Sequence, residues 1–154
     1  MKISHWPTGS NTMNRLTIAK TLFYMTGLGS IIMGLIYMNV NTPMPYHLEA
    51  LAGGWQTLDA KQSLIMMIFL RGAGSGFVCI GLATLAITRF AIKEGNDWAR
   101  WTLLLIAFVE GLPTLFSVLQ IMDQTTGQPP LGLLILSLVG ALAAFLLSAD
   151  KKAV

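Results

Sequence analysis

Charged side chains are scarce in this sequence of 154 residues. Asp, Glu, Lys and Arg make up 11% of it, whereas soluble domains contain about 25%. Hydrophobic residues account for 54%, and the mean hydropathy is +0.64. A chain of this length forms one domain, and this composition places most of that domain inside a lipid bilayer. A separate soluble domain is excluded.

Cysteine and histidine are also rare. The single cysteine, Cys79, lies in an apolar run, so neither an internal disulfide nor a thiolate zinc site can form. His47 and Glu49 lie two residues apart, which alone is a weak metal signal. The chain has no phosphate-binding, dinucleotide or nucleophile-elbow motif. We therefore expect no metal and no cofactor.

Basic residues exceed acidic ones, giving a net charge of +3, but they form no stripe with interleaved aromatic residues. This distribution argues against nucleic acid as a partner. Lys and Arg instead flank the apolar stretches on alternate sides, as cytoplasmic loops do. We predict that the N and C termini are both cytoplasmic. The short loops and small size fit a bacterial inner (cytoplasmic) membrane.

Four apolar stretches have about the 20 residues that a helix needs to cross roughly 30 Å of hydrocarbon. They lie near residues 21–38, 63–88, 101–122 and 131–148. The fold predicted is all-α, an integral membrane four-helix bundle over residues 21–148. A polar leader, 1–20, precedes it, and a short cytoplasmic tail, 149–154, follows.

Two residues of the Asp, Glu, Lys and Arg types fall inside these stretches. Arg71 lies about 12 Å below the outer end of its helix, and Glu110 lies roughly 14 to 18 Å below the outer end of the next. Charges in the hydrocarbon core are costly and usually face a partner, the bundle interior or water. We therefore predict that Arg71 and Glu110 meet, either as a structural ion pair or as a ligand-binding site.

Polar or small side chains recur at helical spacing beside these charges. Thr114 and Ser117 follow Glu110 on one face of its helix. The first stretch carries a matching strip of small or hydroxylated residues: Gly27, Ser30, Gly34 and Tyr37. A polar pocket opening outward is expected, lined by Arg71 and Glu110. The further lining residues expected are Tyr37, Thr114 and Ser117, with Tyr46, His47 and Glu49 brought over the pocket by the loop.

Small residues four apart allow helices to approach closely. Gly72 and Gly76, and likewise Gly140 and Ala144, have this spacing. We interpret both pairs as close-packing contacts, either within one bundle or between bundles.

The stretch RGAGSGFVCIGLATLAI, beginning at Arg71, is an arginine followed by a glycine-punctuated apolar helix. It resembles the second helix of small bacterial four-helix membrane proteins of the broad DoxX-like group, as do the size and layout of the chain. Some members of that group resemble membrane subunits of quinone-linked oxidoreductases. The resemblance marks Arg71 as a functional position.

Three functions fit these observations. The favoured interpretation is an accessory or assembly subunit, with the lipid bilayer and other membrane subunits, or further copies of this chain, as partners. The alternative is a binding or transport protein whose outward-facing pocket holds a small anionic or lipidic ligand on Arg71. The third is an intramembrane enzyme using Glu110 as acid or base with His47 nearby. No catalytic set is complete, so the balance is against an enzyme.

Overall fold

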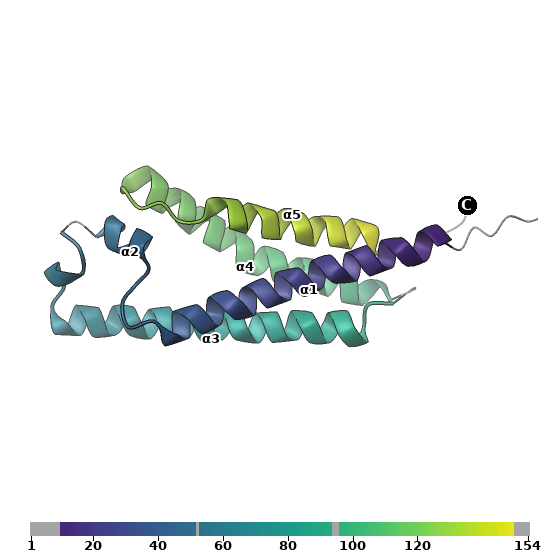
Figure 1. The fold of residues 1–154 in the computed structure, drawn as a ribbon, viewed down its shortest axis with the longest axis horizontal. Coiled ribbons are helices and arrows are strands. Elements are labelled where there is room, and N and C mark those ends of the chain that lie inside the picture. Colours follow the sequence, from purple (N-terminus) through teal and green to yellow (C-terminus); the bar gives the residue numbers. More distant parts are fainter. Residues whose placement is uncertain (1–9, 52, 94–95, 150–154) are drawn as a thin grey trace, which may run out of the picture.

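The structure, a computed structural model, describes residues 10–51, 53–93 and 96–149. Within these ranges the fold is all-α, as predicted, without a strand. The helices are α1 (Ser10–Asn39), α2 (Pro45–Ala50), the 3-10 helix η1 (Trp55–Thr57), α3 (Ala60–Phe90), α4 (Asp97–Gln124) and α5 (Leu131–Leu147). Figure 1 shows α1, α3, α4 and α5 lying lengthwise beside one another, with α2 at one end.

Three helices are long and apolar enough to cross a membrane: α1 over Asn14–Asn39, α3 and α4. This is the property of an integral membrane protein. The fourth predicted span corresponds to α5, which is apolar but has only 17 residues. At 1.5 Å per residue α5 is about 25 Å long, shorter than a typical hydrocarbon core.

The helices extend beyond the apolar stretches that predicted them. α1 begins at Ser10 instead of near residue 21, so part of the expected leader is helical. α4 begins at Asp97, before the apolar run. Hydropathy marks the part of a helix that suits lipid, whereas polar residues can continue the same helix into the headgroup region.

The start of α3 is defined by a capping box. The Asp59 carboxylate accepts hydrogen bonds from the backbone N–H groups of Lys61 and Gln62, both at 2.8 Å. The Gln62 side chain in turn accepts from the Asp59 N–H at 3.0 Å. These bonds satisfy donors that a helix N-terminus leaves free, and they fix where the loop ends.

Glycines bring α1 and α3 into close antiparallel contact. A Cβ atom on Gly34 would lie 2.5 Å from the carbonyl oxygen of Gly74, and one on Gly81 would lie 2.5 Å from that of Gly27. Only a residue without a side chain fits at such distances. Gly72, Gly76 and Gly140 have nothing within 4 Å, so they make no close contact inside the bundle, and their packing between bundles stays a prediction.

Both ends of the helical assembly have a distinct character. At the end where α1 begins and α5 stops, called here the termini end, a tight cluster packs Phe23, Leu103, Phe145 and their neighbours. The opposite end carries α2, η1 and the loop between α4 and α5, and is called the α2 end. Between the termini-end cluster and α2 the helices separate around a cavity.

Candidate functional site

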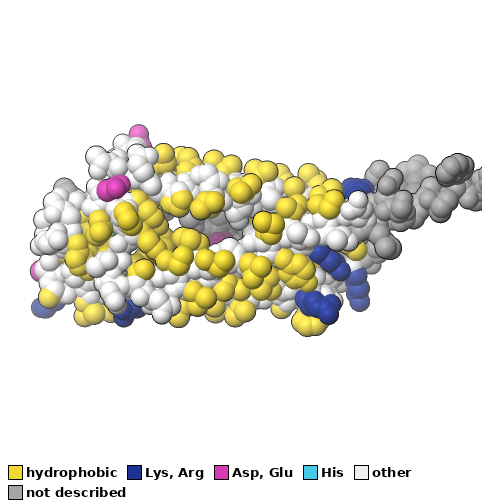
Figure 2. All heavy atoms as spheres, viewed as in Figure 1, with side chains coloured by type: hydrophobic (Ala, Val, Ile, Leu, Met, Phe, Trp, Pro, Cys, Tyr) yellow, Lys and Arg dark blue, Asp and Glu magenta, His cyan; other side chains and the backbone are white. Residues whose placement is uncertain are grey.

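A cavity of about 510 Å³ lies among α1, α4 and α5, with one wall residue from α3 and two from α2. This volume is within the range of small-molecule sites, about 300 to 1,000 Å³. Figure 2 views the molecule across the helices and shows a hollow between the apolar side chains, with an acidic side chain inside it. The hollow lies on the long side of the molecule, between its two ends.

The walls of the cavity are mainly apolar, so the prediction of a polar pocket was wrong in that respect. The contributing side chains come from every long helix and include Leu22, Met25, Met33, Phe77, Val118, Ile121, Leu133, Leu134 and Leu138. The two prolines before α5, Pro129 and Pro130, also line it. Such a surface suits a hydrocarbon chain or ring better than a small hydrophilic solute.

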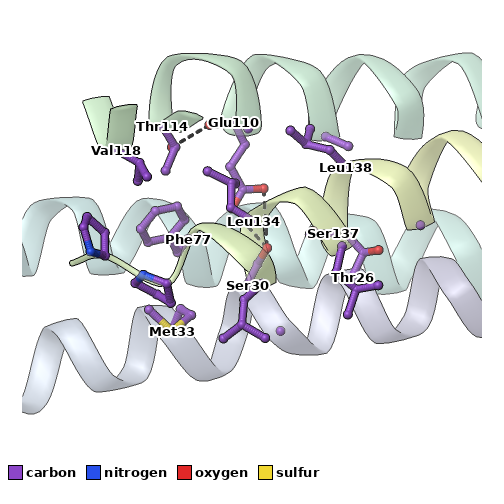
Figure 3. A pocket seen from close by; sticks show the side chains of 18 of the residues that line it. Thr26, Ser30, Met33, Phe77, Glu110, Thr114, Val118, Leu134, Ser137 and Leu138 are labelled. Atoms are coloured by element: carbon purple, nitrogen blue, oxygen red, sulfur yellow. Dashed lines mark hydrogen bonds between the residues drawn. The ribbon is translucent and has the colours of Figure 1, made fainter. Parts of the chain in front are cut away.

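Glu110 is the one Asp or Glu among the lining residues. It lies near the middle of α4, in a segment apolar enough to span a membrane. The hydroxyl of Ser30 on α1 donates to Glu110, with Oγ 3.0 Å from Oε1 and 3.4 Å from Oε2. Figure 3 shows this hydrogen bond reaching across the cavity from α1 to α4.

Two hydroxyls beyond Glu110 line the cavity where the sequence predicted them. Thr114 donates to the Glu110 carbonyl at 2.7 Å, and Ser117 donates to the Pro113 carbonyl at 3.0 Å. Pro113 lies inside α4 and has no N–H to continue the helical ladder. The hydroxyl groups of Thr114 and Ser117 therefore donate their protons to the backbone of their own helix and present oxygen atoms to the cavity.

The α2 segment closes one end of the cavity through a cluster of rings. The hydroxyls of Tyr37 on α1 and Tyr46 on α2 are hydrogen-bonded at 2.5 Å. The His47 ring lies edge-on to Tyr37, with centroids 6.1 Å apart, and tilted against Tyr46 at 4.2 Å. All three residues line the cavity, as predicted.

Burial changes the titration of this cluster. Desolvation, together with the hydrogen bond to Tyr37, raises the pKa of Tyr46 above its ordinary value of 10.0. Desolvation lowers the pKa of His47 below 6.5 because a buried imidazolium loses hydration. The Nδ1 atom of His47 is buried without a hydrogen-bond partner in the described part of the chain.

A backbone contact fastens α2 to the far loop. Thr126, in the connection between α4 and α5, donates from Oγ1 to the Glu49 carbonyl at 3.0 Å. The Glu49 side chain is exposed and does not line the cavity, so its predicted place there was wrong. The carbonyl group of Glu49 thus helps to hold α2 against the loop between α4 and α5, and its side chain lies outside the cavity.

The predicted pairing of Arg71 with Glu110 is not found. Arg71 is exposed on α3, lies outside the cavity, and forms no hydrogen bond or ion pair within the described ranges. α3 packs mainly on α1 and touches α4 little, so matching depth does not bring the two charges together. Glu110 takes Ser30 as its partner instead.

The suggested cooperation of Glu110 and His47 also lacks support from the geometry. His47 lies beside Tyr37, whereas Glu110 binds Ser30. Those two α1 residues are seven positions apart, about 10 Å along the helix. The carboxyl and the imidazole thus occupy different levels of the cavity.

Several wall residues were missed by sequence reasoning, among them Phe77, Ser137 and the leucines of α5. Ser30 belonged to the small-residue strip on α1, so its face was visible in the sequence. Its contact with Glu110 was not, since periodicity assigns faces but does not choose neighbouring helices.

No protein family, curated protein or solved structure matches this chain. The resemblance to the DoxX-like group therefore stays a prediction.

Proposed function

We propose that this protein is a membrane-embedded binding protein that takes an amphiphilic molecule from the bilayer into the cavity between α1, α4 and α5. The observation that carries the proposal is the cavity itself. Its walls are apolar, it lies on the long side of the molecule, which would face lipid, and it holds one carboxyl group. A lipid-soluble molecule could reach it by lateral diffusion without crossing water.

The proposed setting is a transmembrane four-helix bundle in a bacterial inner membrane. Both termini would be cytoplasmic because Lys and Arg concentrate on that side. The α2 end would then face outward, with α2 as a cap at the membrane surface. In this setting Glu110 lies near mid-membrane, about 20 Å from either end of α4.

Arg71 has no part in this binding mode. The earlier expectation of a small anionic ligand required Arg71 in the pocket, whereas the guanidinium lies on an exposed face of α3. Of the two ligand classes expected from the sequence, we therefore propose the lipidic one and not the small anionic one.

Two glycine substitutions test the proposal. Gly29 lines the cavity with nothing within 4 Å of an added Cβ, so Gly29→Leu fills space without a backbone clash. Gly72 is equally free of neighbours but lies outside the cavity, which makes Gly72→Leu the matched control. Each protein is purified from the membrane, and mass spectrometry of the solvent extract measures retained amphiphile per protein.

We expect a stoichiometric amphiphile with the wild type and Gly72→Leu, and its loss with Gly29→Leu. Equal retention by all three proteins would mean that the molecule is ordinary surface lipid. That result would contradict the proposal.

The exposed Arg71 favours a second candidate function, that of an accessory subunit. A guanidinium within a span costs a few kcal/mol unless an anion compensates it. Beside it the face of α3 is made of small exposed residues, Gly72, Ser75 and Gly76, which would admit a helix closely. A partner helix with a carboxylate at this depth would satisfy both features.

The two candidates separate under mutation. Arg71→Gln should release a co-purifying membrane partner while the cavity keeps its amphiphile. Gly29→Leu should do the reverse. If Arg71→Gln changes neither the mass of the purified complex nor its composition, the subunit function is contradicted.

A further inference from the structure

The charges around the cavity point to the chemistry of its ligand, if the proposed binding function holds. We infer that the ligand is a long-chain amine whose ammonium group binds the Glu110 carboxylate. The inference names the class of molecule and the place of its head group.

Within the residues that the structure describes, Glu110 has no positively charged partner. No Lys or Arg is among the residues that line the cavity, and the nearest expected partner, Arg71, lies on an exposed face. Arg100 is engaged with Asp97 at 2.8 Å near the start of α4. An isolated carboxylate in an apolar site is costly, and a cationic ligand head would compensate for it.

The hydrogen bonds around Glu110 leave the carboxylate short of donors. A carboxylate has about four acceptor positions, and among the described residues Ser30 alone donates a side-chain proton to Glu110. The hydroxyl protons of Thr26, Thr114 and Ser117 go to backbone carbonyls instead. Ser137 adds a further hydroxyl to the wall but forms no hydrogen bond with Glu110 in the described part of the chain. The carboxylate thus keeps free acceptor positions, and an ammonium group, like that of lysine, brings three N–H donors.

The shape of the cavity gives the ligand a direction. From Glu110 its apolar wall continues through Met33 and Val118 toward the α2 end (Figure 3). The stretch of α1 between Ser30 and Tyr37 measures about 10 Å along its axis. An ammonium at Glu110 would place the alkyl chain along this wall or out through the hollow on the long side of the molecule.

Charge should therefore rank otherwise similar ligands. An amine adds an ion pair to the hydrogen bond, and charge-assisted hydrogen bonds are roughly twice as strong as neutral ones. An alcohol can donate only a neutral hydrogen bond. A fatty acid would place a second carboxyl group against Glu110, and two like charges at short range disfavour each other.

The ranking can be measured with hexadecylamine, hexadecanol and hexadecanoic acid. Wild-type protein is placed in phosphatidylcholine nanodiscs, and bound probe is counted by native mass spectrometry against protein-free discs. We expect the amine to bind about tenfold more tightly than the alcohol, equivalent to about 1.4 kcal/mol, and the acid to bind most weakly. This ranking needs no mutant.

Glu110→Gln tests the assigned contact. The amide keeps the shape of the side chain and removes its charge, so the amine should fall to the affinity of the alcohol while alcohol binding persists. Asp123→Asn removes an exposed carboxylate of α4 outside the cavity and should leave the ranking unchanged.

The outcomes also distinguish this inference from the function on which it rests. Equal binding of amine and alcohol to the wild type, or preference for the acid, overturns the amine assignment and leaves the binding function standing. An amine preference that survives Glu110→Gln places the charge recognition elsewhere and overturns the inference. No saturable binding of any probe contradicts both.

Discussion

The termini end and the α2 end are built from the same four long helices, yet one is filled and the other hollow. At the termini end Phe23, Leu103 and Ala144 are 1%, 2% and 0% exposed. Toward the α2 end, α1, α4 and α5 contribute Met33, Val118 and Leu134 to the wall of a cavity. Large side chains occur in both places, so residue size alone does not decide which end is packed.

The difference follows from where the helices touch. α1 and α3 stay together through two glycine contacts, Gly27 with Gly81 and Gly34 with Gly74. Near the termini end, Ala141 and Ala144 of α5 are fully buried, whereas Gly140 has open space beside it. A proline inside α4, Pro113, lies on the hollow side of Glu110. Large side chains thus fill the space between the helices at one end, and at the other a cavity remains.

The largest effect expected comes from removing a ring at the filled end. Phe23→Ala should lower the free energy of unfolding by about 3 to 5 kcal/mol because the fully buried ring leaves a void. Phe77→Ala, its matched control on the cavity wall, should lose less because half-buried Phe77 already borders empty space. Unfolding in mixed micelles by SDS titration measures both. Equal losses would contradict the division into filled and hollow ends.

A smaller effect is expected where α1 meets α3. Gly74→Val places a branched side chain against the Gly34 carbonyl, only 2.7 Å from its Cβ position. Overpacking of this kind costs about 1 to 3 kcal/mol. Gly72→Val, on the same helix with nothing within 4 Å, should unfold as the wild type does. If both variants unfold alike in the same titration, the glycine contacts do not hold the two helices together.

The next smaller effect on stability is expected from the hydrogen bond between Ser30 and Glu110, which bridges the cavity. Ser30→Ala removes the donor to Glu110 and should cost about 0.5 to 1.5 kcal/mol. Thr21→Ala is the control, since the Thr21 hydroxyl is exposed and bonds only within its own helix, to the Thr17 carbonyl at 3.0 Å. An unfolding midpoint unchanged in Ser30→Ala would show that the bridge contributes nothing to stability.

The smallest effect concerns the cap at the hollow end and depends on pH. Burial lowers the pKa of His47 below 6.5, so the opened segment binds more protons than the closed one in mildly acidic solution. By linkage the closed cap loses stability as pH falls below about 6.5, through the lowered pKa. Hydrogen exchange in Pro45–Ala50, corrected for intrinsic rates, should therefore quicken with acid. His47→Gln should abolish this dependence, and a cap that opens equally at every pH would contradict it.

Much of the fold could be predicted from the sequence because hydropathy and period report directly on helices in lipid. The stripe of Glu110, Thr114 and Ser117 and the ring residues Tyr37 and Tyr46 were placed correctly at the cavity. The predictions for α4 and for Tyr37 rest on local spacing, which fixes the face on which a side chain lies. Tyr46 was assigned to the cavity because the loop that carries it was expected to fold over the bundle.

The contacts between helices could not be predicted in the same way. Arg71 and Glu110 were expected to pair because they lie at similar depths below the outer ends of their helices. They do not pair, because α3 packs mainly on α1 and has few contacts with α4. Likewise, Gly72 and Gly76 have the spacing typical of a close helix contact, but it is Gly74 and Gly81 that contact α1 closely. Which face of α3 meets α1 depends on all neighbouring helices, and no single segment contains that information.

The most direct test of the cavity as a ligand site is photolabelling with an alkyl amine that carries a diazirine on its chain. Labelled peptides from protein in nanodiscs are sequenced by mass spectrometry. The binding function predicts adducts on the wall, at Met33, Val118 or Leu134, that disappear in Gly29→Leu. Adducts confined to outward side chains of α3 such as Leu64 and Phe69, or insensitive to Gly29→Leu, would contradict it.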